Sequence, residues 1–164
     1  MADEDKGAAP ENTITQGMRI NKIYLKDASF EAPNSPGIFE EKWKPTLEVE
    51  IDNNATEIAE NTYAVVLTVS VRAILEGKTA YMAEVHQAGI FTFNGFEPDA
   101  IRRATNVFCL RFIFPYASAE LSNLISKGGF PQQLLSPVNF EALYEQRLQN
   151  AQAQADAAES AQDA

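Results

Sequence analysis

Apolar and polar residues alternate along the first half of this chain, which is the pattern of strands that bury one face of a sheet. Leu47, Val49 and Ile51 alternate with acids at positions 48, 50 and 52 and predict a half-buried strand. Residues 14–31 predict a long first strand whose imperfect alternation allows a bulge. The clearest pattern covers residues 63–75, where every second side chain is apolar: Tyr63, Val65, Leu67, Val69, Val71, Ala73 and Leu75.

A tight hairpin turn is expected at Glu76-Gly77, where this long strand ends. A fourth strand then runs from Lys78 to about Gln87. Its two faces differ, because Tyr81, Ala83 and Val85 share one face while Met82, Glu84 and His86 share the other.

The periodicity changes to that of a helix after residue 95. Pro98 suits a first helical turn, and Asp99 suits the positive end of the helix dipole. Pro115 is expected to kink or break the helix, because its ring clashes with the preceding turn. One apolar stripe is predicted at helical spacing: Ile101, Ala104, Phe108 and Phe112.

A second helical run is predicted through Leu121, Leu124 and Ile125, and it ends at Gly128-Gly129. A last helix begins near Asn139, whose side chain suits the N-cap position. Four strands followed by helices indicate an α+β fold, with a four-stranded antiparallel sheet, a long Pro-kinked helix and a shorter C-terminal helix packed on one face.

Composition divides the chain into three parts. Residues 1–13 predict a disordered acidic leader, residues 14–149 one domain, and residues 150–164 a flexible acidic tail rich in Ala and Gln. The 164 residues are 45% hydrophobic, which suffices for a single core.

The net charge of −10 and the lack of a basic patch argue against binding to nucleic acid or to an anionic membrane surface. An acidic surface favours a basic protein partner instead. The single cysteine excludes an internal disulfide and a CxxC zinc site. The polar N-terminus and the lack of an apolar run of about 20 residues predict a reduced, cytoplasmic protein that does not insert into membranes.

Three candidates for catalytic or phosphate-binding chemistry are weak. Cys109 and His86 could form a nucleophile and base, but no third orienting group is indicated. Gly128-Gly129 follows a helix instead of preceding one, so a helix stop explains it better than a phosphate cradle. The adjacent acids Glu40-Glu41 are typical of a solvated segment. The chain is therefore predicted not to be an enzyme and to need neither a metal nor a cofactor.

A connector rich in proline and aromatic residues, FEAPNSPGIFEEKWKP, spans residues 30–45. Its prolines stiffen it, so Phe39 and Trp43 can be presented at the surface with little entropy to lose on binding. The segment GGFPQQLLSPVNF at residues 128–140 repeats this composition, and the two loops could flank one apolar groove. The alternative is that these side chains cap the core.

Acidic residues gather on one predicted face of the sheet. With helices on the other side, this face is either free for a partner or simply solvated. Its members are Asp27 and Glu31 in the first strand, Glu48, Glu50 and Asp52 in the second, and Met82 and Glu84 in the fourth.

Several segments together resemble the SecB protein-export chaperones, over about residues 20–149. They are IYLKDASFEAPNSPGIF, the single Trp before Pro45, YAVVLTVSV, TAYMAEVHQAGIF, FPYASAEL and GGFPQQLLSPVNFEALY. The resemblance implies an ATP-independent cytoplasmic chaperone that binds unfolded preproteins, keeps them competent for translocation and delivers them to the SecA motor. It also implies a homotetramer in which two subunits join their sheets and two dimers pack through their long helices.

Site residues are carried over from the family by position. The client-binding residues are Phe39, Trp43, Val49, Phe130, Leu134, Leu135 and Phe140. The SecA-binding residues are Asp27, Glu31, Met82 and Glu84. The positions associated with the tetramer are Ala83, Val85 and Gln87, on the opposite face of the strand.

Two positions in the long helix depart from the family pattern. Leu110 stands where the family often has Pro, and Ser118 stands where an Arg is common, so both bear on the packing of the two dimers. Two other functions stay open at this point: a SecB-like chaperone of a toxin–antitoxin pair, and a carrier of a small hydrophobic ligand.

Overall fold

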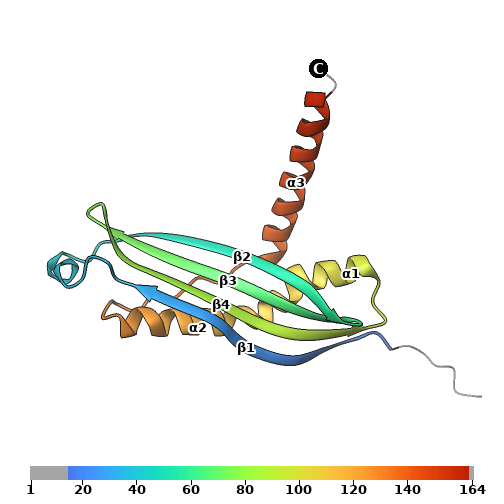
Figure 1. The fold of residues 1–164 in the computed structure, drawn as a ribbon, viewed down its shortest axis with the longest axis horizontal. Helices are drawn as coiled ribbons and strands as arrows, with labels where there is room; N and C mark the ends of the chain where they lie inside the picture. Colours follow the sequence, from blue (N-terminus) through green and yellow to red (C-terminus); the bar gives the residue numbers. More distant parts are fainter. Residues whose placement is uncertain (1–14, 163–164) are drawn as a thin grey trace, which may run out of the picture.

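The computed structural model describes residues 15–162, so the predicted leader lies outside the described residues. Four strands form one antiparallel sheet in the order β1-β4-β3-β2. They are β1 (Gly17–Glu31), β2 (Thr46–Ala59), β3 (Thr62–Leu75) and β4 (Lys78–Asn94). A helical run lies along one face of the sheet, and a last helix projects away from it (Figure 1). The helices are α1 (Pro98–Arg103), α2 (Cys109–Lys127) and α3 (Phe140–Gln162). The predicted α+β fold is confirmed.

The β3–β4 hairpin forms as predicted. Leu75 pairs with Lys78, and Glu76 and Gly77 between them have φ of 49° and 72°. Positive φ at both central residues is the conformation of a two-residue type I′ turn, which matches the twist of the strands. The predicted apolar face of β3 is buried against α2 from Val65 to Leu75.

The first and fourth strands differ from the prediction in their ends. β4 continues beyond Gln87 to Asn94, because its residues there pair with β3 as far as Thr92 and with β1 as far as Asn94. Gly89 interrupts the sequence pattern for a steric reason, since a Cβ there would lie 2.6 Å from Cε2 of the Phe91 ring. β1 begins at Gly17 and has two register shifts, which confirms the predicted irregularity.

The predicted stripe on the long helix is wrong for Phe108 and Phe112, which are exposed. A π-helical turn, η2 (Ala104–Phe108), joins α1 to α2, and the N–H of Cys109 donates to the carbonyl of Ala104 five residues back. The extra residue in this turn rotates everything downstream relative to a continuous α-helix. The residues that face the sheet are therefore Cys109, Leu110, Ile113, Ala117, Leu121 and Ile125.

Pro115 lies inside α2, and the helix continues through it to Lys127. Of the two predicted effects of Pro115, a kink or a break, the break does not occur. The two helical runs expected on either side of it form one helix, because its apolar side packs on β4 and β3. The predicted stop is confirmed at Gly128, followed by Gly129 with φ of 86°.

The start of α3 is fixed by a cap and by ion pairs. Asn139 Oδ1 accepts a hydrogen bond of 3.1 Å from the N–H of Ala142, which confirms the predicted N-cap. Glu141 forms an ion pair with Arg103 and lies 3.9 Å from Arg111 on α2. Phe140 is buried against Phe114, with ring centroids 5.7 Å apart.

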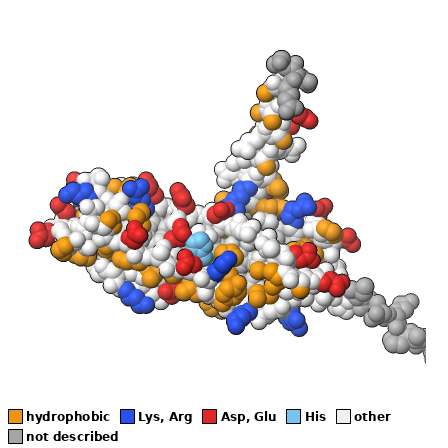
Figure 2. Space-filling view, in the orientation of Figure 1, with side chains coloured by type: hydrophobic (Ala, Val, Ile, Leu, Met, Phe, Trp, Pro, Cys, Tyr) orange, Lys and Arg blue, Asp and Glu red, His pale blue; other side chains and the backbone are white. Residues whose placement is uncertain are grey.

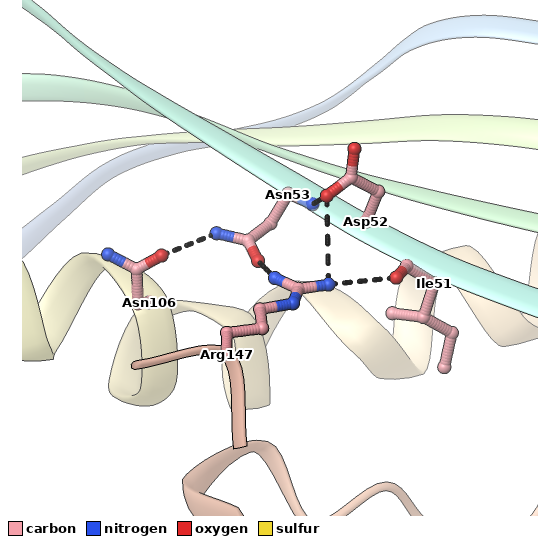
Figure 3. A network of polar contacts seen from close by, with 5 residues as sticks. All are labelled: Ile51, Asp52, Asn53, Asn106 and Arg147. Atoms are coloured by element: carbon pink, nitrogen blue, oxygen red, sulfur yellow. Dashed lines mark hydrogen bonds and ion pairs between the residues drawn. The ribbon is translucent and has the colours of Figure 1, made fainter. Parts of the chain in front are cut away.

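Arg147 ties the second turn of α3 to the edge strand β2 (Figure 3). Its guanidinium donates to Asn53 Oδ1 and, over 2.9 Å, to the backbone carbonyl of Ile51. Asn53 in turn donates to Asn106 Oδ1 over 2.9 Å, and Asn106 donates to the carbonyl of Arg102 in α1 over 2.8 Å. We call Arg147, Asn53 and Asn106 the α3 clamp.

Beyond the clamp, α3 stands clear of the sheet (Figure 1). Every residue from 148 to 161 is exposed, in keeping with the lack of an apolar stripe there. The C-terminal helix therefore differs from the prediction in two details: only its first turns pack, and it spans 23 residues, into the segment expected to be a flexible tail. The flexibility of residues 150–164 stays a prediction.

Candidate functional site

Four aromatic rings gather where the connector after β1 meets the loop after α2. Phe130 is buried at the centre, and its ring centroid lies 5.0 Å from that of Phe39, 5.5 Å from that of Trp43 and 5.0 Å from that of Tyr81. We call these four residues the aromatic cluster. The two loops that the sequence paired by composition therefore meet in space.

The connector is anchored so that Phe39 remains accessible. A 3-10 turn, η1 (Gly37–Glu40), turns Ile38 into the core and leaves Phe39 49% exposed. Asn34 donates to the carbonyl of Thr79 over 2.9 Å, which ties the connector to the β3–β4 hairpin. Trp43 is half-buried and stacks on Tyr81, so it supports the cluster and stays partly accessible. Phe39 is thus the aromatic residue presented at the surface, whereas Trp43 also caps the core.

Tyr81 forms the floor of the aromatic cluster. Its hydroxyl is buried and finds no hydrogen-bond partner among residues 15–162, and burial raises the pKa of Tyr81. A neutral phenol therefore packs against the rings of Trp43 and Phe130 at ordinary pH.

An apolar groove runs beside the cluster, between α2 and residues 132–140. Its volume is about 610 Å³. Phe114, Pro115 and Ala119 line the α2 side. Leu134, Leu135 and Phe140 line the other side, and Leu134 is 71% exposed. The groove thus brings together three of the predicted client-binding residues, but neither Phe39 nor Trp43 lies in its lining.

The remaining predicted client-binding residue, Val49, lies on β2. It is 45% exposed on the face of the sheet that α2 covers at β3 and β4. The predicted client residues therefore occupy three neighbouring features: the aromatic cluster, the groove and the uncovered part of β2. The sequence did not show the α2 side of the groove, because its small residues Ser118, Ala119 and Ser122 resemble an ordinary helix face.

The opposite face of the sheet is acidic, as predicted. Strand register aligns its side chains in rows: Asp27 pairs with His86 and Glu31 pairs with Met82, while Glu84 lies between them on β4. All four predicted SecA-binding residues thus lie on one face, which we call the acidic face. The view in Figure 2 shows the pale-blue imidazole of the chain's single histidine among red acidic side chains.

The centre of the acidic face is a shallow depression of about 380 Å³. Glu48 and Glu50 of β2 join Glu31 and Glu84 around it. The only base in its lining is Arg72, which lies 3.9 Å from Glu48. The sequence places His86 only on a polar face of its strand. In the structure its Nε2 lies 2.7 Å from Glu84 Oε1, so it adds a polar contact to the acidic face.

The predicted tetramer positions point the other way. Ala83, Val85 and Gln87 are buried, and α2 packs over β4. In this subunit they support α2 from beneath. The exposed side of this helical run carries Phe108, the last residue of η2, and Phe112 of α2, whose ring centroids are 5.3 Å apart, with Tyr116 one turn further on.

The candidate catalytic dyad does not assemble. His86 lies on the acidic face, whereas Cys109 is buried beneath the other face of the sheet. Burial raises the pKa of the Cys109 thiol to about 12, so it remains protonated at neutral pH. Within residues 15–162, no group of three or more His, Cys, Asp and Glu residues is placed to hold a metal ion. No helix in the same part of the chain is long and apolar enough to cross a membrane.

Comparison with known proteins identifies relatives over most of the chain. A family model described as the preprotein translocase subunit SecB matches residues 11–151. The protein-export protein SecB of Methylococcus capsulatus is 45% identical over 85% of this chain and 90% of its own length. The protein of the same name from Nitrosococcus oceani is 46% identical over 87% of this chain and 90% of its own length.

A solved structure has the same fold. It is a SecB-like chaperone of Mycobacterium tuberculosis in complex with a peptide from an antitoxin, with a TM-score of 0.60 and 14% sequence identity. The match covers 74% of this chain and 90% of that chain.

Proposed function

The chain belongs to the SecB family of protein-export chaperones, and on that premise we propose that it holds unfolded preproteins without nucleotide and delivers them to the SecA motor. One observation carries the proposal: an apolar surface and an acidic surface occupy opposite faces of one sheet. Tyr81 belongs to the aromatic cluster and Phe30 stacks on it, whereas their sequence neighbours Met82 and Glu31 point to the acidic face. One partner can be held while another docks.

Clients are held by the aromatic cluster, the groove and the uncovered part of β2. These surfaces are apolar and open, so they cover hydrophobic segments of many sequences without demanding one of them. Leu134 and Phe39 are the most exposed of the proposed client-binding residues, and the anchored connector keeps Phe39 in place before a client arrives.

SecA docks on the acidic face. Asp27, Glu31 and Glu84 attract a basic segment, and Met82, 39% exposed in their midst, adds an apolar contact. Exposed charges steer association and are screened beyond about 8 Å at physiological ionic strength. Binding to SecA is therefore expected to weaken as salt rises, whereas client binding changes little.

The chain assembles as a homotetramer in a cytoplasmic setting. Two subunits join their sheets, and the exposed aromatic side of α2 packs against its counterpart in a second dimer. Ala83, Val85 and Gln87 act on this assembly indirectly, because they position α2 from beneath. Leu110 is buried, so its departure from the family acts through the core, while Ser118 faces the groove.

The other functions are less favoured. Likeness to the antitoxin-peptide chaperone is one of fold, at 14% identity, whereas relatives named for protein export are 45–46% identical. The acidic face is also complete, as expected of a chain that still serves an export motor.

Two measurements test the proposal. The purified protein is added to an aggregating unfolded polypeptide with and without ATP, and light scattering is expected to fall equally in both cases. Binding to purified SecA is then measured across a salt series. Unchanged aggregation, a strict need for ATP, or a salt-independent SecA affinity would each contradict it.

A further inference from the structure

The strand β2 lies at an edge of the sheet and leaves backbone groups unpaired. In an antiparallel strand the N–H and C=O groups of alternate residues point to opposite sides. Arg147 approaches Ile51 from outside the sheet and binds its carbonyl, so the backbone groups of Ile51 point to the free side. Those of Val49 and Leu47, two and four residues earlier, then point the same way. Among residues 15–162, neither has a hydrogen-bond partner on that side.

This free stretch has a stop at each end. Pro45, the next residue in the alternation, has no N–H to donate and therefore ends a pairing edge. At the other end the guanidinium of Arg147 occupies the Ile51 carbonyl and also lies 3.6 Å from Asp52 Oδ1. The α3 clamp holds the helix over the edge at this point (Figure 3).

The surroundings of the stretch specify the kind of polypeptide that fits. Leu47 and Val49 turn their side chains to the apolar face, and Val49 is 45% exposed there because α2 packs on β3 and β4. Glu48 and Glu50 turn theirs to the acidic face. A strand added here would place alternate side chains beside an apolar and an acidic surface. A client segment that alternates apolar with polar or basic residues would therefore match both surfaces.

We infer that the edge of β2 between Pro45 and Ile51 is a pairing slot of fixed length for an extended client segment, and that Arg147 is the residue that ends it. The inference rests on the proposed chaperone function and names one way in which the main chain of a client is held. The five residues between the two stops, 46–50, span about 17 Å at about 3.3 Å per residue, so the slot accommodates about five client residues.

A short slot suits a protein that must let its client go. Each main-chain hydrogen bond adds a modest, sequence-independent contribution, and only Leu47 and Val49 offer a free N–H and C=O. A longer edge would pair more of the client and would also invite other chains to add to the sheet. Arg147 therefore limits the number of client residues that can pair with the edge of β2, because it blocks pairing beyond Ile51.

The experiment measures affinity against peptide length. Peptides of five, seven, nine and eleven residues with alternating Val and Lys are titrated against the intact protein by fluorescence anisotropy. For the wild type, affinity is expected to level off at about five residues. In Arg147→Met the edge beyond Ile51 is freed, so the longer peptides should bind about three- to tenfold more tightly while the five-residue peptide is unchanged.

A matched control loosens α3 without freeing the edge. Arg103 pairs with Glu141 and lies 3.9 Å from Glu145 on the other side of α3, so Arg103→Met should leave the length profile unchanged. Hydrogen exchange gives an independent readout. A long peptide should protect the amides of Leu47 and Val49 in the wild type, and that of Ile51 only in Arg147→Met, because Arg147 occupies the Ile51 carbonyl. The Asn53 amide is not a probe, because it already donates to Asp52 Oδ1 over 2.8 Å.

Several outcomes overturn the inference. An unchanged length profile in Arg147→Met does so, as does an equal gain for all lengths or the same shift in Arg103→Met. Protection of Leu47 and Val49 before any peptide is added would show that the slot is an interface between copies of the chain. If the wild type binds unfolded polypeptide and only the length effect fails, the proposed function stands. If it binds none, both fail.

Discussion

Phe39→Ala separates client binding from folding at the aromatic cluster. Because Phe39 is 49% exposed, about 100 Å² of the area that a phenylalanine can bury remains for a client. At about 25 cal/mol per Å² this surface contributes at most about 2.5 kcal/mol to binding, and ordering of the client reduces that gain. We expect affinity for an unfolded polypeptide to fall about tenfold, since 1.4 kcal/mol corresponds to a factor of ten.

The cost to the fold should be smaller than for its buried neighbour. The covered half of the Phe39 side chain has a similar area, so by the same measure it contributes at most about 2.5 kcal/mol to the free energy of unfolding. Phe130 is 5% exposed and touches the rings of Phe39, Trp43 and Tyr81, so Phe130→Ala should cost about 3–5 kcal/mol. Urea denaturation measures these free energies, and anisotropy with a labelled, permanently unfolded polypeptide measures affinity.

An exposed apolar residue elsewhere provides the control. Ile58 is 54% exposed near the other end of β2, so Ile58→Ala should leave client affinity unchanged. The reasoning is refuted if Phe39→Ala and Ile58→Ala bind the client equally well. It is also refuted if Phe39→Ala loses about as much stability as Phe130→Ala while each folded molecule keeps its affinity.

The other predictions concern the acidic face, the buried thiol and one close approach. Glu31→Lys combined with Glu84→Lys should abolish SecA binding yet spare suppression of aggregation. If the double variant loses both activities, the acidic face and the client-binding surfaces are not separate. Cys109 should resist a thiol reagent until the protein unfolds. Because its folded pKa is about 12 and its ordinary pKa is 9.0, the free energy of unfolding should fall as pH rises from 9 to 12. Cys109→Ala should weaken that pH dependence. Gly128→Ala places a Cβ 2.1 Å from Cζ of Phe30, so thermal unfolding should show a loss of about 1–3 kcal/mol; an unchanged melting temperature would mean that the ring moves aside freely.

Sheet and hairpin could be predicted because their determinants are local. The alternation in β3 records one buried face, and Glu76-Gly77 supplies the two positive φ values that the turn needs. The rotation of Phe108 and Phe112 to the surface could not be predicted, because a π-helical turn leaves no periodic signature in five residues. The continuity of α2 through Pro115 depends on packing against the sheet, which a single helix does not reveal.

The candidate site was predictable in part for the same reason. The acids at 27, 31 and 84 follow from strand alternation, and the two aromatic loops follow from composition. The role of Arg147 depends on partners 94 and 96 residues away in the sequence, and no local pattern links them.

The clamped helix also affects how the molecule moves through solution. From Arg147 to Gln162 the chain forms a straight extension of about 22 Å, at 1.5 Å per residue, that carries little mass. Such a protrusion raises the frictional drag of an 18.1 kDa chain above that of a sphere of equal mass. Elution volume alone would therefore overstate the size of any assembly of this chain, and its subunit number should be determined from light scattering or native mass spectra.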